Sequence, residues 1–244
     1  MVIVATIEAR MGSSRLPGKV LFEAAGITML EHLVSRLKRV SIIDKIVVAT
    51  TVHESDNPIV SLCKSSGIEC FRGSENNVMD RVIGAAESVG ASTIVEITGD
   101  CPVIDPSIVE QSIRIFQEHN VDYVSNVILR SYPDGMDTQV FSLETLKKSA
   151  KMTTNKLDLE HVSLHIRNNE SLFSRIHMIA PVEVRWPELG LTLDELGDYK
   201  LLKWLIEEFN HTQPYFSCLD AVTKIRENPH KIELNESVVR KGNS

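Results

Sequence analysis

The sequence has few cysteines, no excess of basic residues and no long apolar run, and each absence excludes a class of protein. Among 244 residues there are four cysteines without a Cys-x-x-Cys pair, too few for a disulfide framework: Cys63, Cys70, Cys101 and Cys218. Lys and Arg number 26 against 33 Asp and Glu, so the net charge is −7, which argues against a general nucleic-acid binder. We therefore expect a reduced protein without a nucleic-acid partner.

A membrane protein is also not expected. No apolar run approaches the roughly 18 residues of a spanning helix, and the first residues lack the pattern of a secretion signal. With 43% hydrophobic and 24% charged residues, the composition is that of a globular protein with a sizeable core. We expect a cytoplasmic protein with a single domain over residues 1–226 and a polar C-terminal tail, 227–244, that frays.

Short apolar runs alternate with helical periodicity along the chain. Strands are predicted at residues 2–7, 46–50, 93–97 and 121–127, and the first two are rich in Val, Ile and Ala, as is typical of parallel strands covered on both faces. The alternation predicts an α/β fold, in which an open, mostly parallel mixed sheet is sandwiched by helices. Its ligand crevice should lie beyond the carboxyl ends of the strands.

Helix starts are marked by capping residues. Thr28 and Glu31 form a capping-box pattern, and Asp105 followed by Pro106 predicts a second start. A third helix begins just after Asp194. Residues 130–169 are less regular, with a Pro-Asp-Gly turn, a strand around 137–141 and two polar helices, and we interpret them as a small substrate-side insertion in the sheet.

A glycine-rich basic loop, Ala9 to Lys19, follows the first predicted strand. Its glycines let the backbone approach a ligand, and its two Arg and one Lys suit a polyphosphate. Five residues separate Gly12 from Gly18 and Val20 follows Lys19, so the loop is not a P-loop. The dinucleotide fingerprint Gly-x-Gly-x-x-Gly is absent as well. An ordinary solvated surface loop is the alternative.

The run Ala9-Arg-Met-Gly-Ser-Ser-Arg-Leu-Pro-Gly-Lys-Val-Leu21 resembles the opening of the spore coat polysaccharide biosynthesis protein F group. That group is related to the cytidylyltransferases that make CMP-3-deoxy-manno-octulosonate and CMP-acylneuraminate. The resemblance spans residues 3–199 and continues through these segments: Asn77 to Arg81, Thr98 to Pro102, Pro133 to Asp137, Glu160 to Val162, and Leu193 to Glu195.

This resemblance implies a Rossmann-like nucleotide-diphospho-sugar transferase fold, CTP as nucleotide donor, Mg²⁺ as cofactor and a homodimer. The catalytic residues would be Arg10, Lys19 and Asp100. The nucleotide-binding residues would be Ala9, Arg10, Gly12, Ser13, Ser14, Arg15, Lys19, Arg81 and Asp100. For Arg81, a surface ion pair is an equal alternative.

Two aspartates follow apolar segments at the expected crevice. A carboxylate facing a triphosphate repels it unless a cation bridges them, and Mg²⁺ uses one or two carboxylates together with phosphate oxygens. Asp100 has this placement, and so has Asp194, whose alternative role is that of a helix N-cap. The resemblance implies that Asp100 and Asp194 bind the metal.

Acceptor-binding candidates lie in the irregular middle of the chain: Asp134, Asp137, Glu160 and His161. Their alternatives are a turn residue and an exposed helical face. Three positions depart from the pattern of the group. Glu8 replaces Gln and would add negative charge beside the triphosphate, Gln139 replaces an acid, and Gly190 replaces a basic residue.

The leading hypothesis is a cytidylyltransferase that transfers CMP from CTP to an acidic sugar of the ulosonic or nonulosonic type, with pyrophosphate release, for a surface polysaccharide. One alternative keeps this chemistry with a phosphonate or a sugar phosphate as acceptor. Another is a non-catalytic nucleotide-sugar-binding subunit, which would not need Lys19, Asp100 and Asp194 together.

Overall fold

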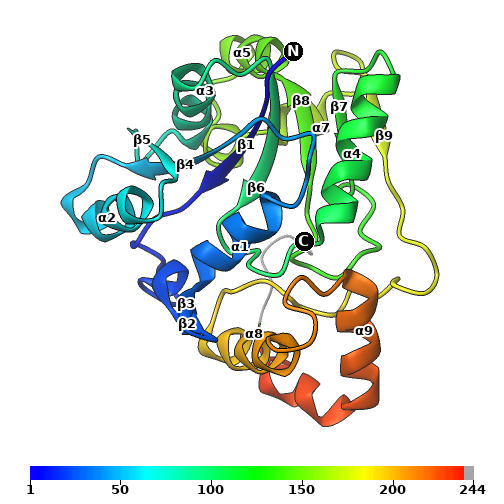
Figure 1. The fold of residues 1–244 in the computed structure, drawn as a ribbon. Coiled ribbons are helices and arrows are strands. Elements are labelled where there is room, and N and C mark those ends of the chain that lie inside the picture. The colour runs from blue at the N-terminus through cyan, green and yellow to red at the C-terminus, as the bar shows by residue number, and fades with distance from the viewer. Residues whose placement is uncertain (239–244) are drawn as a thin grey trace.

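A seven-stranded sheet forms the centre of the computed structural model, which describes residues 1–238 (Figure 1). Its strands, in sheet order, are β5 (Glu69–Gly73), β4 (Lys45–Thr51), β1 (Ile3–Glu8), β6 (Thr93–Thr98), β8 (Gln139–Ser142), β7 (Tyr123–Ser125) and β9 (Arg175–His177). The first four run parallel, β8 is antiparallel to β6 and β7, and β9 is parallel to β7. The prediction of an open, mostly parallel mixed sheet is confirmed.

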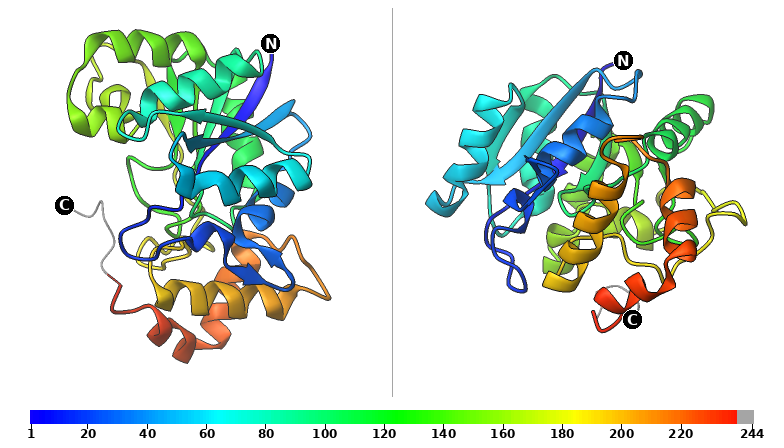
Figure 2. Two further views of the ribbon diagram at one scale, coloured as in Figure 1. Left: turned by 90° about the vertical axis from the view of Figure 1, so that its left-hand side faces the viewer. Right: turned by 60° about the horizontal axis from the view of Figure 1, so that its bottom comes forward.

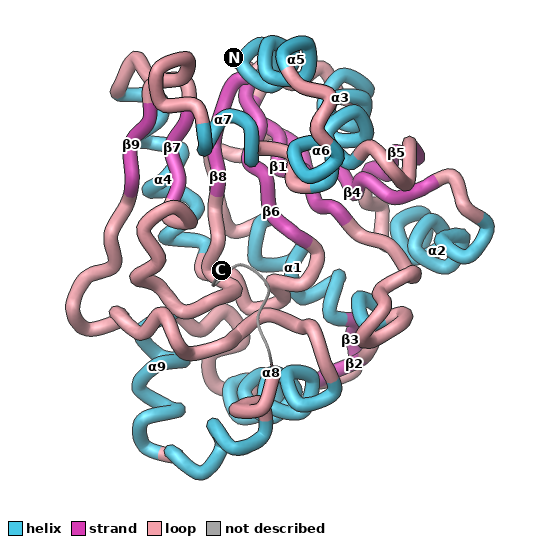
Figure 3. The backbone as a smooth tube through the Cα atoms, turned by 180° about the vertical axis from the view of Figure 1, so that it is seen from behind, coloured by secondary structure: helices cyan, strands magenta, loops and turns pink. Residues whose placement is uncertain are grey.

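Helices cover both faces of the sheet, as its apolar strands require. One face packs against α1 (Met29–Leu37), α2 (Asn57–Ser65) and α4 (Pro106–Glu118). The other carries α3 (Val78–Ser88), α5 (Leu143–Met152), α6 (Lys156–Glu160) and α7 (Leu164–Asn168), which lie in front of the sheet when it is seen from behind (Figure 3).

A third apolar cluster lies below the sheet. It is built on α8 (Leu196–Phe209), α9 (Cys218–Glu227) and the small hairpin β2 (Glu23–Ala24) and β3 (Ile27–Thr28), which the two further views show on one side of the molecule (Figure 2). In residues 1–238 none of the helices has the length and apolar character to cross a membrane.

Register brings the ends of the central strands level with one another. Glu8, the last residue of β1, is paired with Ala49 of β4 and with Thr98 of β6. The loops that follow these three strands therefore leave the same edge of the sheet, where the ligand crevice of an open α/β fold is expected.

The predicted caps of two helices are confirmed. Thr28 and Glu31 form the capping box of α1, and Asp105 caps α4, which has Pro106 in its first turn. For α8 the N-cap is Glu195, whose extended backbone, with φ −132° and ψ 173°, directly precedes the first helical residue, Leu196. The alternative role of Asp194 as a helix cap is therefore wrong.

The irregular middle of the chain contributes directly to the sheet. The strand predicted around 137–141 is β8, which lies between β6 and β7. Three short helices follow it, where two were predicted. Strands β5 and β9 and the hairpin of β2 and β3 were not predicted, because they are short and only partly buried.

The expectation of a frayed tail from residue 227 is wrong for the described part. A 3-10 helix, η3 (Pro229–Leu234), continues after α9, and Asn235 is 4% exposed. The segment is held because Ile232 and Leu234 pack on the cluster around α8. Residues 239–244 of the predicted tail lie outside the described residues.

Candidate active site

The loop after β1 is folded back on itself by its own backbone. The carbonyl oxygen of Met11 accepts hydrogen bonds from the N–H groups of Ser13 and Gly18, both at 2.9 Å. Gly18 has φ 72°, a left-handed conformation that glycine adopts without strain, and directly precedes the 3-10 helix η1 (Lys19–Leu21). The loop therefore has a defined shape that directs Lys19 toward the crevice.

Asp56 anchors this loop to the sheet. It ends the 3-10 helix η2 (Glu54–Asp56) after β4, is 1% exposed, and accepts a hydrogen bond from the Met11 N–H at 2.7 Å. Its second carboxylate oxygen accepts from both hydroxyls of Thr50 and Thr51. Burial opposes its ionisation, but these hydrogen bonds hold the pKa of Asp56 below its ordinary value.

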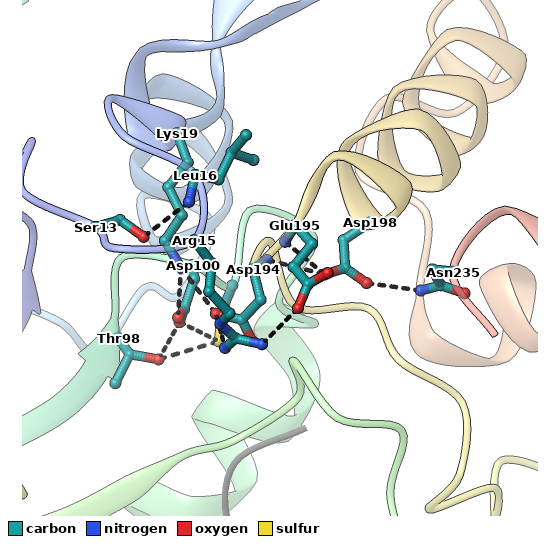
Figure 4. Close-up of polar contacts among 11 residues, drawn as sticks. Ser13, Arg15, Leu16, Lys19, Thr98, Asp100, Asp194, Glu195, Asp198 and Asn235 are labelled. Atoms are coloured by element: carbon teal, nitrogen blue, oxygen red, sulfur yellow. Dashed lines mark hydrogen bonds and ion pairs between the residues drawn. The ribbon is translucent and has the colours of Figure 1, made fainter. Parts of the chain in front are cut away.

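Lys19 joins the two aspartates that the sequence singled out. Its Nζ lies 3.2 Å from Oδ2 of Asp100 and 3.0 Å from Oδ1 of Asp194 (Figure 4). Asp100 follows β6, and Asp194 precedes α8, so the three residues come from three separate parts of the fold. Their convergence makes one charged centre at the carboxyl edge of the sheet.

Arg15 adds a second cation to this centre. Its guanidinium lies 3.0 Å from Oδ1 of Asp194 and 3.2 Å from Oε1 of Glu195. Figure 4 shows Arg15 and Lys19 approaching Asp194 together. Cations that face a polyphosphate neutralise it, so this half of the loop has the charge that a triphosphate requires.

The remaining loop residues are distributed around this centre. Ala9 is buried at the end of β1, whereas Gly12 and Ser14 are exposed. The Ser13 hydroxyl accepts from the Leu16 N–H at 3.4 Å. Arg10 is exposed and lies 3.5 Å from Glu75. A surface pair of this kind contributes little to stability, so Arg10 can exchange Glu75 for a ligand.

The charges of the centre stabilise one another in their ionised forms. Burial opposes the ionisation of Asp100, but the Lys19 ammonium and the Thr98 hydroxyl outweigh it and lower the pKa of Asp100. Burial likewise opposes the ammonium form of Lys19, and Asp100 and Asp194 together raise its pKa. Near neutral pH Asp100 is therefore a charged carboxylate and Lys19 a charged ammonium.

The donor set fits Mg²⁺ in company with a phosphate ligand. In residues 1–238 no group of three or more His, Cys, Asp or Glu side chains is arranged to hold a metal by itself. Asp100 and Asp194 nevertheless converge on a single cation, the Lys19 ammonium. Two carboxylates completed by phosphate oxygens and water are a usual magnesium environment.

A second charged cluster combines two of the predicted acceptor residues with an arginine. Arg130 lies 3.0 Å from Oδ1 of Asp134 and 3.4 Å from Oδ2 of Asp137. Burial raises the pKa of Asp137 to about 6, helped by Asp134 and Asp100 and opposed by Arg130. The backbone oxygen of Asp134 accepts from the Leu191 N–H at 2.7 Å and that of Asp100 from the Leu193 N–H at 2.8 Å, so this cluster lies beside the first.

Glu160 and His161, the other two predicted acceptor residues, make no contact with this cluster within residues 1–238. Glu160 lines a cavity of about 700 Å³ together with Arg10, Asn77 and other residues of α3 and α6. His161 is exposed and follows the end of α6, where its N–H donates to Leu157. The structure thus places Glu160 beside the glycine-rich loop and His161 at the surface.

Arg81 and Glu8 differ from expectation in their environments. Arg81 is 3% exposed and donates to the carbonyl oxygen of Ser74 at 2.5 Å, so the alternative of a surface ion pair is wrong. Burial and the neighbouring Glu96 raise the pKa of Glu8 well above its ordinary value, against the effect of Arg81. Burial and the neighbouring Glu96 therefore oppose the negative charge that the sequence predicted for Glu8.

The other two departures from the group's pattern have structural roles. Gln139 is buried, and its side-chain oxygen accepts from the hydroxyls of Tyr123 and Ser163. Gly190 pairs with the backbone of Asp134, and its carbonyl oxygen accepts from the Asn235 side chain. These two positions are parts of the scaffold around the second cluster.

Several residues of the site were missed from the sequence. Asp56 and Asp198 act on backbone N–H groups, and Asp198 accepts from those of Asp194 and Glu195. Arg130 precedes the Pro-Asp-Gly turn that it neutralises, and its spacing of four and seven residues from Asp134 and Asp137 was the available signal.

An open α/β sheet with a cationic loop after its first strand and paired aspartates at its carboxyl edge defines a nucleotidyltransferase. The family profile described as Cytidylyltransferase matches residues 4–228. The chain belongs to this cytidylyltransferase family and is a CTP-dependent nucleotidyltransferase.

Individual relatives agree over most of the chain. The spore coat polysaccharide biosynthesis protein SpsF of Bacillus subtilis is 32% identical over 232 residues, 93% of this chain and 95% of the relative. A 3-deoxy-manno-octulosonate cytidylyltransferase of Geobacter metallireducens is 30% identical over 225 residues, 80% and 85% of the two chains. The structure of a cytidylyltransferase from Leptospira borgpetersenii superposes with a TM-score of 0.91 at 30% identity, covering 98% and 100%.

Proposed function

We propose that the protein transfers CMP from CTP to an acidic sugar of the ulosonic or nonulosonic type, with release of pyrophosphate, for a surface polysaccharide. The observation that carries the proposal is the Lys19 ammonium held between Asp100 and Asp194 beside the glycine-rich loop. The acceptor class is supported by the relatives, which are named for spore coat polysaccharide and for 3-deoxy-manno-octulosonate. The adjacent Arg130 offers a guanidinium in the same crevice.

The nucleotide would lie along the loop after β1. Lys19 and Arg15 face the crevice and would neutralise the triphosphate, with Arg10 at its rim. The cavity beside Arg10 has room for the nucleoside, and buried Arg81 supports its wall through Ser74. Asp56 keeps the loop in place by accepting from Met11.

Asp100 and Asp194 would hold Mg²⁺. When bound there, Mg²⁺ would supply Lewis-acid stabilisation of the negative charge that develops on the phosphates as pyrophosphate leaves. At Asp100 the contribution of the protein is to hold the carboxylate in its ionised form, through the Lys19 ammonium and the Thr98 hydroxyl. Lys19 then faces the leaving pyrophosphate.

Asp137 is suited to take a proton from an acceptor hydroxyl. Its pKa of about 6 leaves it largely ionised at neutral pH and close enough to neutrality for proton transfer. Arg130 holds Asp137 and Asp134 together, so one guanidinium orients both carboxylates. An acceptor that attacks through a carboxylate or phosphonate oxygen would not need this base.

Pyrophosphate release with CTP, Mg²⁺ and a panel of acceptors tests the proposal. The panel holds ulosonic and nonulosonic acids, a phosphonate and a sugar phosphate, and we expect release with an acidic sugar. Asp100→Asn keeps the shape but loses the charge, so it should remove nearly all turnover while the melting temperature stays near that of the wild type. Release with the phosphonate or the sugar phosphate alone would show that the acceptor belongs to that class and is not an acidic sugar.

Absence of release in every arm, with nucleotide-sugar binding retained, would show a non-catalytic binding subunit. Wild-type turnover of Asp100→Asn at saturating Mg²⁺ would overturn the metal assignment.

The proposal also includes a homodimer in the cytoplasm. The four cysteines are free in the structure, which accords with a reduced compartment.

A further inference from the structure

The backbone that carries Asp194 is held by a buried carboxylate. Asp198, in the first turn of α8, is fully buried, and its Oδ2 accepts from the N–H groups of Asp194 at 3.0 Å and Glu195 at 2.9 Å. One buried side chain thus fixes the positions of two neighbouring backbone N–H groups. The orientation of Asp194 therefore depends on where Asp198 is held.

Asn235 holds Asp198 in turn, from the far end of the chain. Its Nδ2 donates to Oδ1 of Asp198 at 2.8 Å and to the carbonyl oxygen of Gly190 at 3.0 Å. Figure 4 shows Asn235 on the side of Asp198 that faces away from Lys19. The side-chain amide of Asn235 thus links Gly190, at the start of the 190–194 segment, to the Asp198 carboxylate. That carboxylate in turn binds the N–H of Asp194 at the end of the segment.

The segment between these two ties connects the two charged clusters. The N–H of Leu191 donates to the backbone oxygen of Asp134 at 2.7 Å, and that of Leu193 to the backbone oxygen of Asp100 at 2.8 Å. A displacement of this segment would move Asp194 relative to Asp100. Asn235, at 4% exposure, braces it from behind.

Close packing holds Asn235 at this distance. A Cβ atom added to Gly197 would lie 2.3 Å from the carbonyl oxygen of Leu234, so η3 sits directly against the first turn of α8. The Lys231 ammonium also lies 5.1 Å from the ring centre of Trp204 on α8. The match to the family profile ends at residue 228, before Asn235.

We infer that Asn235 is a positioning residue for the reaction, which acts through Asp198 and Gly190 to hold Asp194 beside Asp100. It would act through these two partners and not by contact with a substrate. The part of this inference that concerns metal affinity rests on the proposed function, whereas the part that concerns the Asp194 backbone does not. Partners that orient a metal ligand from behind typically change metal affinity or activity by about 10–100-fold when removed.

Asn235→Ala tests the inference, with Asn228→Ala as matched control. Asn228 ends α9, and its side chain donates only to the carbonyl oxygen of Lys224 among the contacts found. For Asn235→Ala we expect faster hydrogen exchange in the peptide spanning 190–198, measured by mass spectrometry. We also expect Mn²⁺, used as a paramagnetic probe on the CTP-bound protein, to bind about 10-fold more weakly. CTP binding without metal should stay unchanged.

The control should leave exchange at 190–198 and Mn²⁺ affinity as in the wild type. Gly197→Ala is a second variant that displaces the Leu234 carbonyl without removing a partner, and it should reproduce the pattern of Asn235→Ala. Wild-type exchange at 190–198 in Asn235→Ala, or equal effects in Asn228→Ala, would overturn the inference. Faster exchange with unchanged Mn²⁺ affinity would support the positioning of Asp194 and overturn its metal role.

Discussion

Lys19 Nζ lies 3.0 Å from Oδ1 of Asp194, although 175 residues separate them in the sequence. Lys19 opens a 3-10 helix after the first loop, and Asp194 lies just before α8. This contact exists because β1 and the segment before α8 reach the same edge of the sheet. The active centre is therefore a product of the whole fold and of no single motif.

Lys19→Ala should impair CTP binding and turnover together. The ammonium faces both the ground-state triphosphate and the leaving pyrophosphate, so its loss should cost about 2–4 kcal/mol of transition-state stabilisation, or tens- to hundreds-fold in kcat/KM for CTP. Steady-state pyrophosphate release measures the effect. Lys64→Ala, at an exposed position of α2, is the control. An unchanged rate would mean that Lys19 does not face the phosphates.

The acidic limb of the pH profile should report Asp137. If this carboxylate takes the acceptor proton, kcat/KM for the acceptor should fall as the pH drops through about 6. Arg130 lowers the pKa of Asp137, so Arg130→Ala should move the limb to higher pH and raise the acceptor KM. Arg114→Ala, in an exposed pair with Glu110, should move neither. If the pH profile of the Asp137→Asn variant retained the acidic limb, another group would be responsible for that limb.

Substitutions of Glu160 and of His161 should have different effects on the KM values of the two substrates. Because Glu160 borders the cavity beside Arg10, we expect Glu160→Gln to change the KM for CTP. His161 is exposed, so His161→Ala should change neither substrate's KM. Varying each substrate in turn measures both values. A raised acceptor KM with normal CTP kinetics in either variant would support the acceptor role that the sequence predicts for that residue.

Glu96 should make the protein less stable as the pH rises. Burial raises its pKa to about 8, while Arg167, Ser163 and Gln139 oppose the rise. Between its ordinary pKa and 8 the folded state keeps a proton that the unfolded state has lost. The free energy of unfolding therefore declines with pH through this window, by at most about 1.4 kcal/mol per pH unit for this group.

Glu96→Gln removes one of two buried glutamates with a raised pKa, the other being Glu8, and should make this decline shallower without abolishing it. Urea unfolding at pH 5, 6, 7 and 8 measures the slope for each protein. Glu69→Gln, at an exposed position of β5, should keep the slope of the wild type. Parallel slopes for Glu96→Gln and the wild type would show that Glu96 is ionised in the folded protein throughout this range.

The elements that could be predicted from the sequence are those whose own residues are apolar enough to indicate that they are buried. The strands β1, β4 and β6 were predicted to within one or two residues, because their apolar runs are continuous and buried on both faces. β5 was not, since four of its five residues are only half-buried and its apolar run is only two residues long. η3 was missed because its stability comes from packing on α8 and leaves no periodic pattern.

The same division applies to the site. Lys19, Asp100 and Asp194 have chemistry that a triphosphate needs, and the structure brings them together as the sequence suggested. Asp56 and Asn235 act on backbone groups that are distant in sequence, so their residue types carried no comparable signal.

The insertion of β8 between β6 and β7 has a consequence for synthesis on the ribosome. β6 ends at Thr98 with apolar residues on both faces, and within residues 1–238 the strand that pairs with its outer edge is β8, which begins at Gln139. β7 emerges earlier but pairs with β8 and β9, not with β6. Until β8 is made, the nascent sheet ends in an open, apolar edge strand, the feature that promotes aggregation and the binding of chaperones.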